Sequence, residues 1–172
     1  DKPALQRWSF SGIFGSFDTA QLQRGFQVYK EVCAACHSMN YIAFRNLGDE
    51  GGPHFSEEEV KALAATYTVT DGPDEAGDMF ERPGKPYDHL PAPFANTEAA
   101  KSANGGAAPP DLSLMAKARH ISRGLLWAIV DFFTAYQEGG PDYIHAVLTG
   151  YQDPPAGVDV PCVLIYVTGV LT

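Results

Sequence analysis

The stretch EVCAACHSMN, residues 31–40, has two cysteines three positions apart and a histidine directly after the second. Residues i and i+3 of a helix or tight turn project to one side, so Cys33 and Cys36 can reach one edge of a flat ring. C-x-x-C-H is the attachment signal for c-type haem, in which both thiols bond to the porphyrin and the imidazole becomes an axial iron ligand. The stretch therefore predicts one covalently attached haem c, with His37 as the metal ligand.

Other uses of a cysteine pair fit this chain less well. A disulfide needs no adjacent histidine, and a zinc site needs about four ligands, usually from two such clusters. The chain has 3 cysteines and no second cluster, so we expect Cys162 to be a small buried residue. A redox-active dithiol is a further alternative, but no strand signal precedes the motif. A chance occurrence of the pattern also stays open.

Composition favours a single mainly α domain over residues 1–172, with long irregular loops. The chain combines 17 glycines and 13 prolines with a hydrophobic fraction of 45%, and a haem can replace part of the missing core. Its 12 basic and 21 acidic residues give a net charge of −9. Nucleic acid is excluded as a partner, because phosphate recognition needs a basic surface. A basic protein partner fits the charge, as does simple solubility.

Covalent haem attachment also predicts a compartment outside the cytosol, either the bacterial periplasm or the mitochondrial intermembrane space. The opening residues DKPALQRW look like a terminus left after processing. The chain contains no run of 18 apolar residues, so we expect no transmembrane helix within these residues.

The strongest helix signal covers residues 16–37, which end in the cysteine motif. Asp18 can cap its start, with Gln21 three residues on. Apolar residues recur at helical spacing along one face: Leu22, Phe26, Tyr29 and Cys33. Gly25 lies beside this face and predicts the close approach of another backbone, since glycine inside a helix costs about 1 kcal/mol against alanine.

Weaker signals organise the rest of the chain. Ser56 and three glutamates open a second predicted helix at residues 56–67. Residues 70–110 show no periodicity and predict a long surface excursion. A short helix is expected within 110–123, an apolar segment over 124–140, and a helix over 141–151 between Pro141 and Gly150. The tail 162–172 is rich in β-branched residues and reads as a short strand of unclear role.

Three segments in this order resemble the cytochrome c1 family: GFQVYKEVCAACHSM (25–39), ANGGAAPPDLSLMAKARH (103–120) and GGPDYIHAVLTGY (139–151). The family supplies the haem subunit of ubiquinol–cytochrome c oxidoreductase complexes. The likeness extends over residues 8–161, nearly the whole chain. It implies a cytochrome c-like haem domain.

The resemblance also implies roles for individual residues. Cys33 and Cys36 would hold the haem, and His37 would be its proximal ligand. Arg119 would pair with a haem propionate, for which a guanidinium fork is better suited than lysine. The remaining pocket residues that it implies are Asn104, Ala107, Pro109, Pro110 and Met115 on one side, and Tyr143, Val147 and Leu148 on another edge.

Three features of the family are not seen in this sequence. They are a methionine sixth ligand in a later segment, a C-terminal helix crossing the first helix, and a membrane anchor. We expect the natural chain to continue; a truncated variant with altered ligation is the alternative. The candidates for the sixth ligand stay open: Met39, Met79, Met115, His54, His89, His120 and His145.

The function implied by the resemblance is one-electron transfer, with no substrate transformed by this chain alone. It would accept an electron from a Rieske iron–sulfur protein and pass it to a soluble basic cytochrome c. Cytochrome b would be a further partner, in a respiratory or photosynthetic complex anchored in the membrane. That complex would face the bacterial periplasm or the mitochondrial intermembrane space. The alternatives are a five-coordinate haem sensor or enzyme that binds a gas or peroxide, and a free periplasmic cytochrome.

Overall fold

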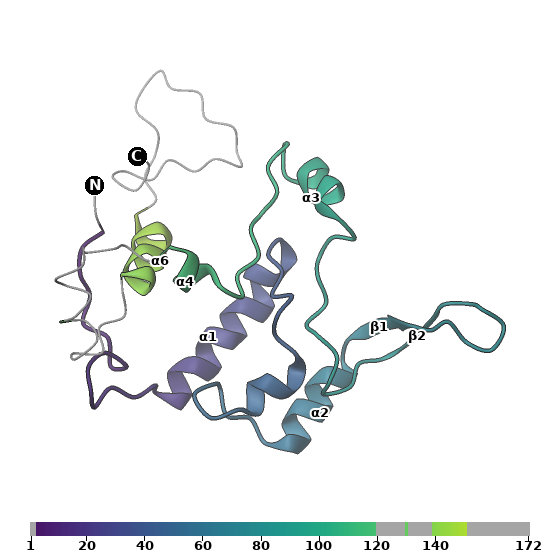
Figure 1. The fold of residues 1–172 in the computed structure, drawn as a ribbon, viewed down its shortest axis with the longest axis horizontal. Helices are drawn as coiled ribbons and strands as arrows, with labels where there is room; N and C mark the ends of the chain where they lie inside the picture. Colours follow the sequence, from purple (N-terminus) through teal and green to yellow (C-terminus); the bar gives the residue numbers. More distant parts are fainter. Residues whose placement is uncertain (1–2, 120–129, 131–138, 151–172) are drawn as a thin grey trace. The chain divides into compact units, whose positions relative to one another are not determined.

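The computed structural model describes residues 3–119, 130 and 139–150. The chain divides into two compact units (Figure 1). Unit 1 comprises Asp1–Ser16 with Asn96–Thr172, and unit 2 comprises Phe17–Ala95. The expectation of a single domain over the whole chain stays a prediction.

Unit 2 begins with helix α1, Thr19–Glu31. The carboxylate of Asp18 accepts a hydrogen bond from the backbone N–H of Gln21 at 3.1 Å, which confirms the predicted cap. The helix ends before the cysteine motif, where Cys33–Ala35 form the 3₁₀ turn η1. On the predicted apolar face, Phe26 and Tyr29 pack against the core of the unit. The predicted helix is therefore real, but its last turn tightens at the two cysteines.

The next two elements are the 3₁₀ helix η2, Phe44–Gly48, and helix α2, Glu57–Ala65. Ser56 closes a capping box: its hydroxyl accepts from the N–H of Glu59, and its own N–H donates to the Glu59 carboxylate at 2.8 Å. These bonds with Ser56 lower the pKa of Glu59 below its usual range. The predicted helix start at Ser56 is confirmed.

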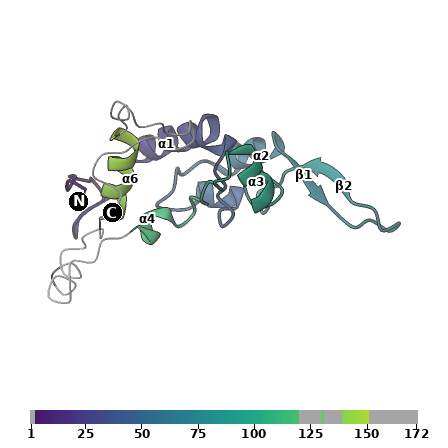
Figure 2. The same ribbon diagram turned by 90° about the horizontal axis from the view of Figure 1, so that it is seen from above.

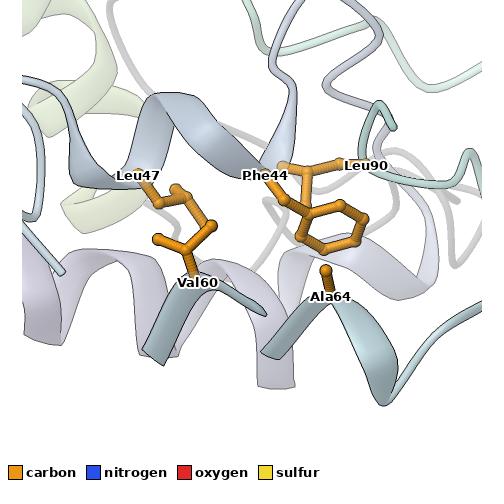
Figure 3. Close-up of a cluster of buried hydrophobic side chains, with 5 residues drawn as sticks. All are labelled: Phe44, Leu47, Val60, Ala64 and Leu90. Carbon is orange, nitrogen blue, oxygen red and sulfur yellow. The ribbon is translucent and has the colours of Figure 1, made fainter. Parts of the chain in front are cut away.

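The core of unit 2 lies between η2 and α2. Phe44 is fully buried and lies over Ala64 and beside Leu90, while Leu47 faces Val60 (Figure 3). Backbone hydrogen bonds tie the neighbouring loop to this layer: Leu90 N–H donates to the carbonyl of Ile42 at 2.9 Å. A short apolar layer thus holds the segment that follows the cysteine motif.

A two-stranded antiparallel hairpin follows α2 and extends beyond it in both views (Figures 1 and 2). Strand β1, Thr68–Asp71, pairs with β2, Phe80–Pro83. This hairpin and helix α3, Thr97–Ala103, correct the prediction that residues 70–110 form an irregular excursion. Four-residue strands with one exposed face give too short an alternation to stand out from the surrounding loop residues.

Arg82 fixes the base of this hairpin. Its guanidinium donates two hydrogen bonds to Asp88, at 2.7 and 3.0 Å, and a third to Asp71. It also lies 5.6 Å from the centre of the Tyr87 ring. The bonds with Arg82 lower the pKa of both carboxylates, and the two carboxylates raise the pKa of the guanidinium.

Unit 1 contains α3, the short helix α4, Met115–Ala118, and helix α6, Gly140–Thr149. The predicted start and stop of α6 are confirmed, with Pro141 in its first turn and Gly150 at its end. A Cβ atom added to Gly140 would lie 1.8 Å from the carbonyl oxygen of Ala116. Only glycine therefore allows this contact between α4 and α6.

The mainly α fold predicted from the sequence is confirmed for the residues that the structure describes. Their helices include none long and apolar enough to cross a bilayer. The apolar segment 124–140 lies almost entirely outside the described residues, as do His120, the tail 162–172 and Cys162.

Candidate functional site

The cysteine motif forms one tight turn at the end of α1. The carbonyl of Cys33 accepts two backbone hydrogen bonds, from Cys36 at 3.1 Å and from His37 at 2.8 Å. The carbonyl of His37 accepts a third, from the hydroxyl of Tyr29 at 3.3 Å. The backbone of His37 is therefore held at both its N–H and its carbonyl.

The residues of this turn suit a covalently held haem. Cys33 is half-buried, Cys36 is exposed, and both are free thiols. Two thiols and an imidazole on one short turn are the donor set that c-type haem attachment requires. Within residues 3–119, 130 and 139–150, no three His, Cys, Asp or Glu side chains gather as a metal site.

Exposed apolar side chains flank the turn along the chain. Val28 is 55% exposed and Val32 is 68% exposed, both ahead of the cysteines, and Tyr41 after them is 70% exposed. Large apolar side chains left open beside one motif are typical of a surface that a ligand or a partner covers.

The first group of predicted pocket residues lies in unit 1, around the end of α3. Asn104 is half-buried at the C-terminus of that helix, where its amide donates to the carbonyl of Ala100 at 2.7 Å. Ala107 is exposed, and its N–H donates to the carbonyl of Asn104 at 3.3 Å. Pro109 is half-buried and Pro110 exposed in the loop that follows. These four residues therefore form one continuous turn and loop.

The second group brings α4 and α6 together in the same unit. Met115 opens α4, and Arg119 ends it, with its guanidinium 5.9 Å from the centre of the Tyr143 ring on α6. One turn further along α6, Val147 is half-buried and Leu148 is 65% exposed. The structure thus brings Arg119 and Tyr143 together, and their roles in a pocket stay predictions.

The open candidates for a sixth iron ligand have separate surroundings. Met39 packs against the core of unit 2, whereas Met79 is 60% exposed on the hairpin. His89 forms a backbone bridge with Ala43. The ring of His145 meets Trp8 edge-on at 6.0 Å. Nothing in these contacts selects one of them as a ligand.

Sequence reasoning missed two features of the described residues. One is a cleft of about 590 Å³ in unit 2 between α1 and α2, lined by Gln23, Phe26, Lys30, Phe55 and Leu63 among others. The alternation of polar and apolar residues along α1 carries a faint signal for it. The other is the buried carboxylate of Asp142, for which a single sequence holds no signal.

Comparison with known proteins identifies the family of this chain. Residues 8–168 match the model of the Cytochrome C1 family. The chain belongs to the cytochrome c1 family. This confirms the resemblance read from the three motifs, and it confirms haem c as the cofactor, because a cytochrome is a haem protein.

Individual relatives cover most of this chain. A Bradyrhizobium diazoefficiens protein named cytochrome b/c1 is 60% identical over 162 residues, which are 94% of this chain and 24% of that protein. Cytochrome c1 of Blastochloris viridis is 47% identical over 94% of this chain and 57% of its own length. An Arabidopsis thaliana protein named cytochrome c1 1, heme protein, mitochondrial, is 49% identical over 89% of this chain and 43% of its own length. The chain thus spans less than two thirds of each of these relatives.

Proposed function

We propose that this chain carries one electron at a time from a Rieske iron–sulfur protein to a soluble cytochrome c. The observation that carries the proposal is the turn Cys33–His37, which places two free thiols and an imidazole together in a member of the cytochrome c1 family. When bound, the haem supplies an iron that cycles between the ferric and ferrous states. The chain's own residues tether the cofactor, orient its ligand and shield it.

The proposed roles in unit 2 follow from the geometry of the turn. Cys33 and Cys36 would hold the haem through thioether bonds, each formed by addition of the thiol S–H across a vinyl group, and the His37 imidazole would be a ligand of its iron. The hydrogen bonds from His37 N–H to Cys33 and from Tyr29 to the His37 carbonyl hold the backbone of this ligand in place. These bonds fix the backbone from which the imidazole extends, so they limit where the ring can lie.

The proposed roles in unit 1 concern the propionates and the walls of the pocket. Among the described residues no carboxylate pairs with Arg119. Its guanidinium stacks on the Tyr143 ring, which leaves its planar fork of N–H donors available for another partner. We assign this fork to a haem propionate. The walls are assigned to Asn104, Ala107, Pro109, Pro110, Met115, Tyr143, Val147 and Leu148.

The partners belong to the proposal as well. Cytochrome b and the Rieske protein are the expected neighbours in a membrane complex, held there by an anchor outside these residues. The relative named cytochrome b/c1 supports the first of these partners. Bacterial and mitochondrial relatives support a membrane complex, and we place the haem domain on its periplasmic or intermembrane-space side. The net charge of −9 favours a basic cytochrome c as the electron acceptor, since opposite charges speed the encounter.

Electron transfer from the full-length protein in its native membrane tests the function. After reduction of the haem, we expect a basic cytochrome c to be reduced rapidly, and the rate to fall as ionic strength rises past about 0.1 M, where the Debye length is about 10 Å. A rate that does not respond to salt contradicts the electrostatic docking. Rapid carbon monoxide binding with no electron transfer would favour the sensor alternative instead.

Substitutions in the turn test the attachment. Cys36→Ser removes one of the two thiols, so we expect a large loss of covalent haem, measured by haem staining after denaturing electrophoresis and by the pyridine haemochrome spectrum. Ser38→Ala, two residues on, is the matched control and should keep the full haem content. Equal haem content in both variants contradicts the assignment of Cys36.

A further inference from the structure

A buried carboxylate joins the two ends of unit 1. Asp142 is only 3% exposed and lies in the first turn of α6. Its Oδ1 atom accepts two hydrogen bonds from the N-terminal segment: 2.8 Å from the indole Nε1–H of Trp8 and 3.0 Å from the backbone N–H of Gln6. These partners lie 134 and 136 residues away in the sequence. A buried charge is retained at such a site only when it is hydrogen-bonded, as it is here.

Trp8 provides more than a single hydrogen bond. Its ring stacks on Phe10, with 5.4 Å between ring centres, and it meets the edge of His145 at 6.0 Å. His145 lies one turn after Asp142 on α6. The indole therefore contacts two successive turns of this helix, once by a charge-assisted hydrogen bond and once by ring packing.

The opposite side of the helix start is fixed by α4. The backbone of Gly140 approaches Ala116 so closely that no side chain fits between them, and Arg119 stacks on Tyr143. The start of α6 is thus held between the N-terminal segment and α4. Tyr143, Val147 and Leu148, which the proposed function assigns to the haem, all lie on the helix that these contacts hold.

We propose that Asp142 is a positioning residue of the haem pocket, and that Trp8 is the partner through which it acts. The carboxylate fixes α6 against the N-terminal segment and so sets the placement of Tyr143 and its neighbours. The inference rests on the proposed function for those neighbours. A purely structural contact would stabilise unit 1 without changing the electronic environment of the cofactor, whereas a positioning contact changes both.

The test compares Trp8→Phe, Asp142→Asn and the double variant in the full-length holoprotein. Trp8→Phe removes the indole donor but keeps an aromatic ring and the negative charge. The readouts are the midpoint potential of the haem, its circular dichroism in the Soret band, and the midpoint of thermal unfolding. Glu98→Gln, which removes one negative charge from an exposed helix of the same unit, is the matched control.

We expect Trp8→Phe and Asp142→Asn each to shift the potential and change the Soret dichroism, and the double variant to shift the potential no further than the larger single change. A lower unfolding midpoint with an unchanged potential in Trp8→Phe overturns the proposal in favour of a structural contact. The proposal is also overturned if Asp142→Asn shifts the potential, Trp8→Phe does not, and Glu98→Gln shifts it by the same amount. The shift is then an effect of charge. If Asp142→Asn does not fold, Trp8→Phe still decides between these outcomes. Absence of covalent haem from the unmodified protein contradicts the proposed function instead.

Discussion

Helices α1 and α2 lie in the same unit and are both capped, yet they differ in what they bury. None of the 13 residues of α1 is buried, whereas the 9 residues of α2 include the buried Val60 and Ala64. Helix α1 ends in exposed valines and leads directly into the cysteine motif. The comparison separates two roles: α2 packs into the core of the unit, and α1 presents an exposed surface and leads into the cysteine motif.

The largest difference in unfolding free energy should come from removing the aromatic ring that packs on α2 and the one that α1 itself carries. Phe44 is fully buried against α2, so Phe44→Ala removes a whole aromatic ring from the core and should cost about 3–5 kcal/mol of unfolding free energy. Phe26 on α1 is only half-buried, and Phe26→Ala should cost roughly 1–2 kcal/mol. Denaturant unfolding measures both values. Equal losses would remove the distinction between the two helices.

Two glycines sharpen the comparison, because each can be changed to alanine. A Cβ atom at Gly84 would lie 2.6 Å from the carbonyl oxygen of Ala64, so Gly84→Ala should destabilise the unit by about 1–3 kcal/mol. A Cβ atom at Gly25 on α1 meets no atom of the described residues within 4 Å, so Gly25→Ala should stabilise the helix by about 1 kcal/mol.

The same pair tests the sequence prediction for Gly25. The described residues bring no second backbone near this glycine, so that prediction stays untested by them. If a longer form of the protein does pack a backbone there, Gly25→Ala will lower its unfolding midpoint while raising that of residues 1–172. A gain of stability in both forms contradicts the predicted close approach.

The caps should give a smaller difference. Ser56→Ala removes the hydroxyl that accepts from the N–H of Glu59 at the start of α2, keeps the bond from the residue 56 backbone N–H to the Glu59 carboxylate, and should cost about 1 kcal/mol. Asp18→Ala also removes one bond, at 3.1 Å, and should cost less, about 0.5 kcal/mol, because α1 has no buried residue and its first turn can fray without exposing the core. Chemical denaturation of the two variants under one set of conditions makes the comparison. A larger loss from Asp18→Ala would mean that α1 matters more to the fold than its burial indicates.

Local signals in the sequence predicted the starts of α1 and α2 and both ends of α6 correctly, but they missed α3. Asp18, Ser56, Pro141 and Gly150 each mark a helix end through hydrogen bonds or backbone angles within a few residues, and such effects are visible in a single sequence. The cysteine spacing likewise carries its own chemistry. The family motifs added the pocket residues of unit 1, whose roles stay predictions.

What the sequence did not reveal depends on residues far apart in the chain. Trp8 and Asp142 meet across 134 residues, and neither position is unusual in its local pattern. The hairpin was hidden because its strands are four residues long and its tip is exposed. Arg82 looks like one more charged loop residue until the fold places Asp71 and Asp88 beside it. Tertiary contact, rather than propensity, decides such positions.

The smallest expected effect concerns pH and the hairpin that follows α2. Hydrogen bonds from Arg82 lower the pKa of Asp88 in the folded protein, while in the unfolded chain it is about 3.9. Because the folded pKa is the lower one, this carboxylate stabilises the fold above about pH 4. That contribution is lost as the pH falls from about 4 through the folded pKa. Helix α1 has no comparable ion pair among the described residues.

Asp88→Asn should therefore lose less stability than the unmodified protein when the pH is lowered from about 6 to 3. Thermal unfolding at several pH values measures the difference. Asp78→Asn removes the same charge from the tip of the same hairpin without touching Arg82, so it is the matched control. Parallel pH profiles for Asp88→Asn and the unmodified protein would mean that the ion pair does not fix the hairpin base. The stability of unit 2 would then rest on the apolar layer around α2 alone.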